Sequence, residues 1–141
     1  VVLAMHAALQ ALQLVLVQRL YGFLYGIRQH TLHQGRTQHV LTELHVHNLL
    51  RVQRMSIPLV AIALYPCNIE FLRMRLAQCR ATETPHEIEQ RLQGAVQEMA
   101  LLLRYRKYFN LVVEVSAHTE AQVPQAVVEF LRPLLEKENL L

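Results

Sequence analysis

One unbroken run of apolar residues, Pro58–Leu64, constrains the fold of this chain most strongly. A strand that is apolar at every position, and not only at every second one, is typical of a strand covered on both faces. A second β-type run, Leu111–Val115, follows after a long stretch with helical periodicity. Because parallel strands are joined by such helical crossovers, the sequence predicts an α/β fold with a parallel sheet flanked by helices.

Start and stop signals mark the expected helices. Thr84 followed by Glu87 has the spacing of a capping box, and a proline stands at the first helical position, so a helix is expected over 85 to about 103. Pro133 is expected to kink or end a closing helix over Val123–Glu136. The other expected elements are the helices Ala4–Gln13, Arg28–Gln34, Asn48–Arg54 and Ile69–Gln78 and the strands Leu14–Val17 and Thr37–Leu44.

The composition is that of a globular domain and excludes several classes of function. The 141 residues suffice for one domain, and 52% hydrophobic with 18% charged residues excludes a disordered chain. The net charge of +3 comes without a dense basic run, so no nucleic-acid partner is expected. No apolar run reaches the ~18 residues of a membrane span. Two cysteines outside any CxxC pair predict reduced thiols and a cytoplasmic location.

A family resemblance is carried first by residues 80–84, which read Arg-Ala-Thr-Glu-Thr. Together with the following Ile88 and Arg91-Leu92, this segment resembles the lid of guanylate kinases, which reads Arg-Gly-Thr-Glu-Thr before a helix with a second Arg. Three weaker matches occur in the family's order and extend the resemblance over roughly residues 14–135. They are Gly22–Gly26 (the Gly-x-x-Tyr-Gly segment that opens the helix after the GMP-binding strands), Pro58–Leu76 (strand, proline turn and Arg-rich helix) and Tyr108–Val113 (the final strand).

The resemblance implies a P-loop kinase-like fold in which the first strand and the phosphate-binding loop are absent. No Gly-x-x-x-x-Gly-Lys-[Ser/Thr] motif occurs in the sequence. Other family positions have changed as well: the guanine-reading Glu falls near Leu16, the Ser after Tyr-Gly is Ile27, the second of two strand acids is His45, Gln-Gly is His47-Asn48, the lid Gly is Ala81 and the last-strand Asn is Glu114.

The resemblance also assigns candidate site residues. Arg80 and Arg91 would contact the transferred phosphate in an active enzyme, because phosphoryl transfer depends on positioning and charge stabilisation. Tyr25 would donate a hydrogen bond to the acceptor's phosphate, and Glu43 and His45 occupy the acceptor-binding positions. The alternative readings are solvated arginines, a packed tyrosine and a solvent-facing strand-end carboxylate.

Histidine is concentrated in the first half of the chain. His45 and His47 are expected on one face of a strand, and His30 and His33 on one face of a helix. A zinc site needs three or four converging ligands, and no Cys or acidic cluster accompanies either pair. We therefore expect no metal site.

The missing first strand has a consequence for the sheet. In the family it lies between the strands that Thr37–Leu44 and Pro58–Leu64 resemble, so its loss exposes two rows of unpaired backbone groups. The two strands could pair directly, a second chain could fill the slot, or the chain could be part of a longer domain. A rearranged or oligomeric fold is favoured.

These expectations combine into a single guanylate kinase-like domain, with a GMP-region remnant (1–35), a core (36–78), a lid and lid helix (79–104) and a C-terminal core (105–141). A non-catalytic interaction or scaffolding module is favoured, inactive because nothing cradles ATP. No cofactor is expected, with ATP and Mg²⁺ required only if a P-loop were restored. The alternatives are a fragment of a guanylate kinase, consistent with Val in place of Met at position 1, and an artificial sequence without an evolved role.

Overall fold

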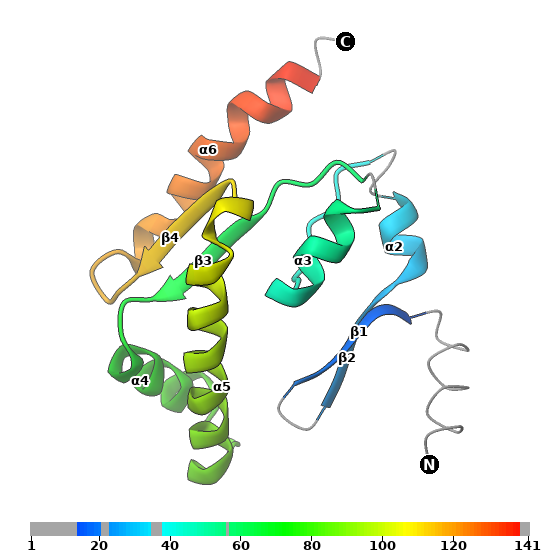
Figure 1. Ribbon diagram of the computed structural model, residues 1–141. Helices are drawn as coiled ribbons and strands as arrows, with labels where there is room; N and C mark the ends of the chain where they lie inside the picture. The colour runs from blue at the N-terminus through cyan, green and yellow to red at the C-terminus, as the bar shows by residue number, and fades with distance from the viewer. Residues whose placement is uncertain (1–13, 21–22, 35–37, 56, 139–141) are drawn as a thin grey trace, which may run out of the picture. The chain divides into compact units, whose positions relative to one another are not determined.

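The computed structural model describes residues 14–20, 23–34, 38–55 and 57–138, which fall into two compact units, Val1–Val60 and Ala61–Leu141 (Figure 1). Both units combine helices with strands, so the chain is a mixed α/β protein. Each unit contains one small sheet of two strands within the described residues.

The first unit is built on an antiparallel hairpin. Strands β1 (Leu14–Leu20) and β2 (Phe23–Arg28) pair with each other, and helix α2 (Gln29–Gln34) continues directly from β2 (Figure 1). Helix α3 (Val46–Gln53) follows after an extended stretch without regular structure. The core of this unit consists of Leu16, Leu32 and Val52, with Val15, Ile27, Leu44, Ile57 and Leu59 packed around it.

Leu16 has an unusual backbone conformation within β1. Its φ is 56°, in the left-handed region that residues other than glycine avoid, and the pairing register shifts between Val15 and Gln18 around it. The Leu16 side chain is only 6% exposed, and its carbonyl accepts a hydrogen bond of 2.7 Å from Asn48 Nδ2. Core burial and this hydrogen bond from α3 therefore offset the backbone strain.

The second unit contains the parallel strand pair. β3 (Ile62–Pro66) lies beside β4 (Leu111–Val115), with Ile62 opposite Leu111 (Figure 1). The crossover between them consists of α4 (Ile69–Cys79), α5 (Pro85–Arg104) and the short helix η1 (Arg106–Tyr108). After β4, η2 (Glu120–Gln122) leads into α6 (Val123–Glu138).

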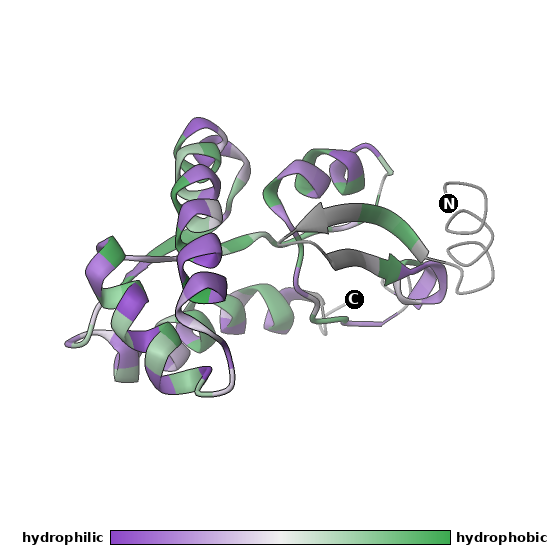
Figure 2. Ribbon diagram, turned by 90° about the horizontal axis from the view of Figure 1, so that it is seen from below, coloured by the Kyte–Doolittle hydropathy of each residue, from purple (hydrophilic) through white to green (hydrophobic). Residues whose placement is uncertain are grey.

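The helices of the crossover begin at well-defined caps. Asn68 caps α4 by accepting a hydrogen bond from the Phe71 backbone N–H at 2.8 Å. α5 is amphipathic, and hydrophilic and hydrophobic residues run side by side along the helices in Figure 2. Phe71 of α4 and Leu92 and Leu102 of α5 are buried. Their burial provides the apolar packing that holds the crossover together.

Several predicted elements agree with the structure. The strand Leu111–Val115 and the helices predicted at Asn48–Arg54, Ile69–Gln78 and 85 to about 103 are all present, with ends that shift by at most two residues. The parallel arrangement of the two apolar strands is also observed. A larger P-loop kinase-like sheet stays a prediction.

Other predictions are wrong or need adjustment. The predicted strand Thr37–Leu44 does not form, because residues 38–45 have no regular structure. The strand predicted at Pro58–Leu64 is shifted to Ile62–Pro66. Residues 23–26 of the Gly-x-x-Tyr-Gly segment belong to β2, whereas the helix predicted at Arg28–Gln34 is present as α2 (Gln29–Gln34). Helix α6 continues through Pro133 to Glu138 and does not end there. The predicted helix Ala4–Gln13 lies outside the described residues.

Candidate functional site

The lid-like segment forms a tight turn between two helices of the second unit. Arg80 is the C-cap of α4, and its N–H donates to the Leu76 carbonyl at 2.9 Å. The Glu83 N–H donates in turn to the Arg80 carbonyl, also at 2.9 Å, and Thr84 then starts α5. The turn therefore places the predicted site residues Arg80 and Arg91 on either side of Glu83.

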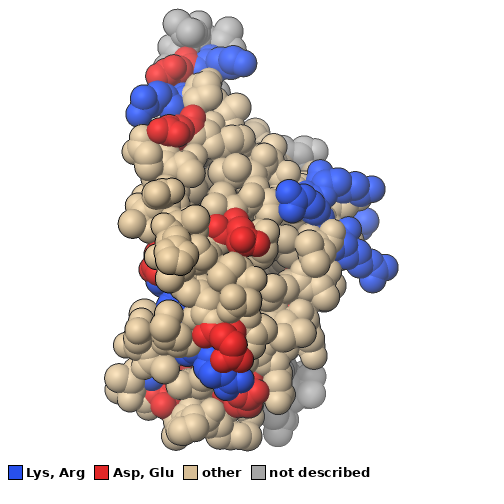
Figure 3. All heavy atoms as spheres, turned by 90° about the vertical axis from the view of Figure 1, so that its left-hand side faces the viewer, with Lys and Arg blue, Asp and Glu red and all other residues tan. Residues whose placement is uncertain are grey.

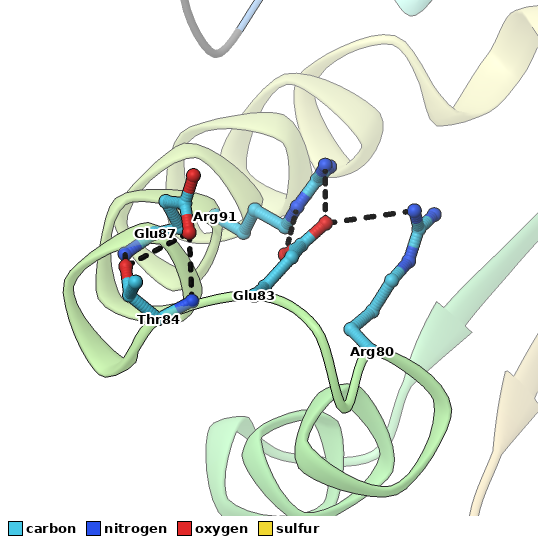
Figure 4. A network of polar contacts seen from close by, with 5 residues as sticks. All are labelled: Arg80, Glu83, Thr84, Glu87 and Arg91. Atoms are coloured by element: carbon cyan, nitrogen blue, oxygen red, sulfur yellow. Dashed lines mark hydrogen bonds and ion pairs between the residues drawn. The ribbon is translucent and has the colours of Figure 1, made fainter.

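The carboxylate of Glu83 pairs with both arginines (Figure 4). Arg91 Nε donates to Glu83 Oε2 at 2.8 Å and Arg91 Nη2 donates to Oε1 at 2.9 Å. Arg80 Nη1 lies 3.5 Å from the same Oε1. The Arg91 contact is a two-pronged guanidinium–carboxylate pair, which fixes geometry more strongly than a single ion pair.

Burial separates the roles of the two arginines. The Arg91 and Glu83 side chains are 20% and 16% exposed, whereas the Arg80 side chain is 52% exposed. Breaking a partly buried ion pair is costly, because it leaves a charge without its partner. The pair with Glu83 therefore holds the Arg91 side chain in place. Arg80 remains accessible to an anion in solvent. The three side chains together carry one net positive charge.

A capping box fixes the start of α5 beside this pair. Glu87 Oε2 accepts hydrogen bonds from the Thr84 N–H at 2.7 Å and from the Thr84 hydroxyl at 2.8 Å, and Thr84 Oγ1 accepts from the Glu87 N–H at 3.3 Å. The hydrogen bonds from Thr84 hold the pKa of the Glu87 carboxyl below its usual range. The turn is therefore anchored at both ends.

Neighbouring charges on α4 are also paired. Arg73 Nη1 lies 2.6 Å from Glu89 Oε2 of α5, and Arg75 pairs with Glu120 of η2. Acidic and basic side chains lie next to one another at the lower end of Figure 3, where α4 and α5 are found. These pairs neutralise α4 and α5 locally and do not present a strongly basic surface.

The acceptor-side residues all belong to the first unit. Glu43 is exposed in the stretch without regular structure. His45 caps α3, where its Nδ1 accepts a hydrogen bond from the His47 N–H at 3.2 Å. Tyr25 lies in β2, and its side chain is outside the described part of the structure. The structure therefore brings Arg80 and Arg91 together, and places Glu43 beside the helix start that His45 caps.

The predicted placement of two histidines is wrong. His45 and His47 do not share a strand face, because they lie at the start of α3 with ring centroids 5.2 Å apart in an edge-on arrangement. His30 and His33 are exposed on α2. Within the described residues, no group of three or more His, Cys, Asp or Glu side chains is arranged to hold a metal ion.

Sequence reasoning missed three residues of structural consequence. The first is Glu83, the shared partner of both arginines, whose spacing of three positions from Arg80 and eight from Arg91 places it within reach of each. The second is Asn48, a polar side chain that is 5% exposed. Tyr65 is the third.

Tyr65 and Glu114 form a pair across the parallel strands. The two residues are opposite each other in the register, and the Tyr65 hydroxyl donates to Glu114 Oε2 at 3.1 Å. Burial, followed by the hydrogen bond and negative charge of Glu114, raises the pKa of the Tyr65 hydroxyl. Glu114, at the position where the resemblance expects an Asn, therefore makes a cross-strand contact.

Comparisons with known proteins identify no family. No protein-family model matches the chain, and no curated protein is significantly similar to it. The resemblance to guanylate kinases thus rests on the residues quoted above and stays a prediction. Among the helices of the described residues, none combines the length and apolarity needed to cross a membrane.

Proposed function

We propose that this chain is a non-catalytic guanylate kinase-like module that binds a peptide or protein partner at the surface corresponding to the GMP cleft. The observation that carries the proposal is the hydrophobic cluster of the first unit. Leu16 is buried in that cluster and Ile27 packs against it. These are the positions at which the resemblance places a guanine-reading carboxylate and a serine hydroxyl.

A buried apolar pair offers no side-chain hydrogen bond to a purine or a phosphate. A site built to hydrogen-bond its substrate discriminates by ~10⁴–10⁵ against an analogue that lacks the matching group. Without the guanine-reading carboxylate, the protein loses the same discrimination between guanine and other ligands. The exposed Glu43 precedes Leu44, which packs against this cluster, so polar groups next to the core are available to contact a peptide partner.

The lid supports a non-catalytic role through its ion pairs. Phosphoryl transfer requires arginines that are free to stabilise charge on the transferred group. Arg91 instead donates two hydrogen bonds to Glu83, and the sequence contains no P-loop to hold ATP. The proposal therefore includes no bound ATP or Mg²⁺. It also includes a cytoplasmic location and no nucleic-acid partner.

A fragment of an active guanylate kinase is the second candidate. The convergence of Arg80 and Arg91 on one carboxylate favours it, because phosphate oxygens make the same kind of guanidinium contact as Glu83 does. The sequence upstream of Val1 in the gene product separates the two candidates. A strand followed by a Gly-rich loop with Lys would favour the kinase.

The proposal is tested by selecting peptides from a random displayed library on the full chain and measuring their affinity in solution. We expect binding that shifts the amide NMR signals of the first unit and is weakened at least about fivefold by Glu43→Gln and by His45→Asn. Asn retains the helix cap, so the second variant removes the ring and keeps α3.

His30→Asn is the matched control, since His30 is an exposed histidine of the same unit. It should leave the affinity unchanged. Binding that is equally weakened by His30→Asn, or displaced by micromolar GMP, would contradict the proposal, as would failure to select any peptide.

A further inference from the structure

Strand β3 has an open outer edge. It pairs with β4 on one side, and no strand of the described residues lies on the other. A sheet of two strands is at best marginally stable alone, and unpaired strand edges are sites at which another strand can add.

The hydrogen bonds to β4 show which residues face the open edge. The Ala61 carbonyl accepts from the backbone N–H groups of Asn110 and Leu111, and the Cys67 N–H donates to the carbonyl of the last residue of β4. Alternate residues of a strand direct their backbone groups to opposite sides. Ile62 and Leu64, of the other parity, therefore direct their N–H and C=O groups to the open edge.

The same two residues form an apolar surface that is exposed at Leu64 and half-buried at Ile62. Ile62 and Leu64 lie opposite Leu111 and Val113 in the register, so their side chains form one apolar face of the strand pair. Leu64 is 54% exposed, although it lies within the most apolar run of the chain. Backbone groups directed at the open edge and an exposed apolar side chain thus coincide at Leu64.

We propose that the outer edge of β3 pairs antiparallel with the same edge of a second copy of this chain, so that two strand pairs join into one continuous sheet. No charged residue occurs in β3 or in residues 57–61 before it, so self-pairing brings no like charges together. A two-fold arrangement covers both open edges with the same contact, which is the usual geometry of a homodimer.

Pro66 limits the register of this pairing. It shares the outward parity of Ile62 and Leu64 and has no N–H to donate, so the donors of β3 end at Leu64. One pairing that uses both outward donors of each copy places Ala63 on the two-fold axis and Ile62 opposite Leu64 of the second copy. Opposite residues of this kind exchange both N–H and C=O groups, and their side chains cover each other on the apolar face.

The inference is tested by light scattering coupled to size exclusion over a range of concentrations. The wild-type chain should elute with twice the 16.3 kDa mass of one chain at high micromolar concentration. Leu64→Lys places a charge in the contact and should raise the dimer dissociation constant at least about tenfold. Leu64→Pro removes the outward N–H and should do the same. Circular dichroism verifies that each variant is folded.

Leu103→Lys is the matched control, because Leu103 is 64% exposed on α5 and lies outside the edge. It should leave the dimer intact. A wild-type monomer at about 200 μM, or equal disruption by Leu103→Lys, would overturn the inference. Hydrogen exchange adds an independent readout. Protection of the Ile62 and Leu64 amides in a monomer would show that a segment of the same chain covers the edge, which also overturns it.

Discussion

The turn between α4 and α5 is held by side chains that are close in sequence, whereas the first unit is held by contacts between distant segments. Arg80, Glu83 and Arg91 meet within one turn and the start of one helix. In the first unit, Asn48 reaches the Leu16 carbonyl across 32 positions of sequence. The difference teaches that the lid-like region is specified by its own residues, and that the first unit depends on packing between elements.

The largest expected effect tests whether the two units are stabilised separately. Leu92→Ala removes a side chain that is 2% exposed and should destabilise the second unit by about 2–5 kcal/mol through the cavity it leaves. Hydrogen exchange followed by mass spectrometry should show faster exchange in peptides from 61–138 only. Leu103→Ala, at an exposed position of the same helix, is the control. Equally faster hydrogen exchange in peptides from 14–60 would show that the two units are not stabilised separately.

The second prediction concerns the distant contact of the first unit. Asn48→Ala leaves the Leu16 carbonyl without its donor and should cost about 1–3 kcal/mol, measured by denaturant unfolding. Arg51→Ala removes only an exposed donor to Asn48 Oδ1 and should cost much less. If both variants unfold at the same denaturant concentration, the hydrogen bond to the strained residue contributes nothing.

The third prediction concerns the cap of the lid helix. Thr84→Ala removes the hydroxyl that accepts from the Glu87 N–H and should cost about 1 kcal/mol of the second unit's stability. Thr82→Ala changes an exposed threonine of the same turn and should be near neutral. A larger loss for Thr82 than for Thr84 would show that the cap does not hold the turn.

The smallest expected effect is a pH dependence. The folded pKa of Glu87 is lowered, so the stability it contributes is present above the ordinary value of 4.5 and is lost as the pH falls through the lowered pKa. Thermal unfolding of the wild type and Glu87→Ala should therefore differ at pH 6 and converge as the pH falls through the lowered pKa of Glu87. If the difference in unfolding temperature between the two proteins grows on acidification, the folded pKa of Glu87 is raised and not lowered.

The sequence predicts the second unit better than the first for a physical reason. The capping residues Thr84 and Glu87 define α5 without reference to the rest of the chain, and the structure agrees. A strand, by contrast, exists only where a partner is available, and the β-like composition of Thr37–Leu44 does not provide one. Residues 38–45 accordingly have no regular structure.

The candidate site shows the same limit. The pairing of Arg80 and Arg91 with Glu83 follows from spacing within one turn. The burial of Leu16 in the first unit's core required contacts with Leu32 and Val52, and no local pattern indicates these. The strained φ of Leu16 is equally invisible in sequence, because Leu carries no preference for that region.

The most direct test of the proposed non-catalytic role is a coupled assay of phosphate transfer from ATP·Mg²⁺ to GMP by the full chain. The account predicts a rate equal to the blank, because Arg91 is engaged by Glu83 and no P-loop is present in the sequence. Turnover above the blank that is abolished by Arg80→Ala and Arg91→Ala would contradict it.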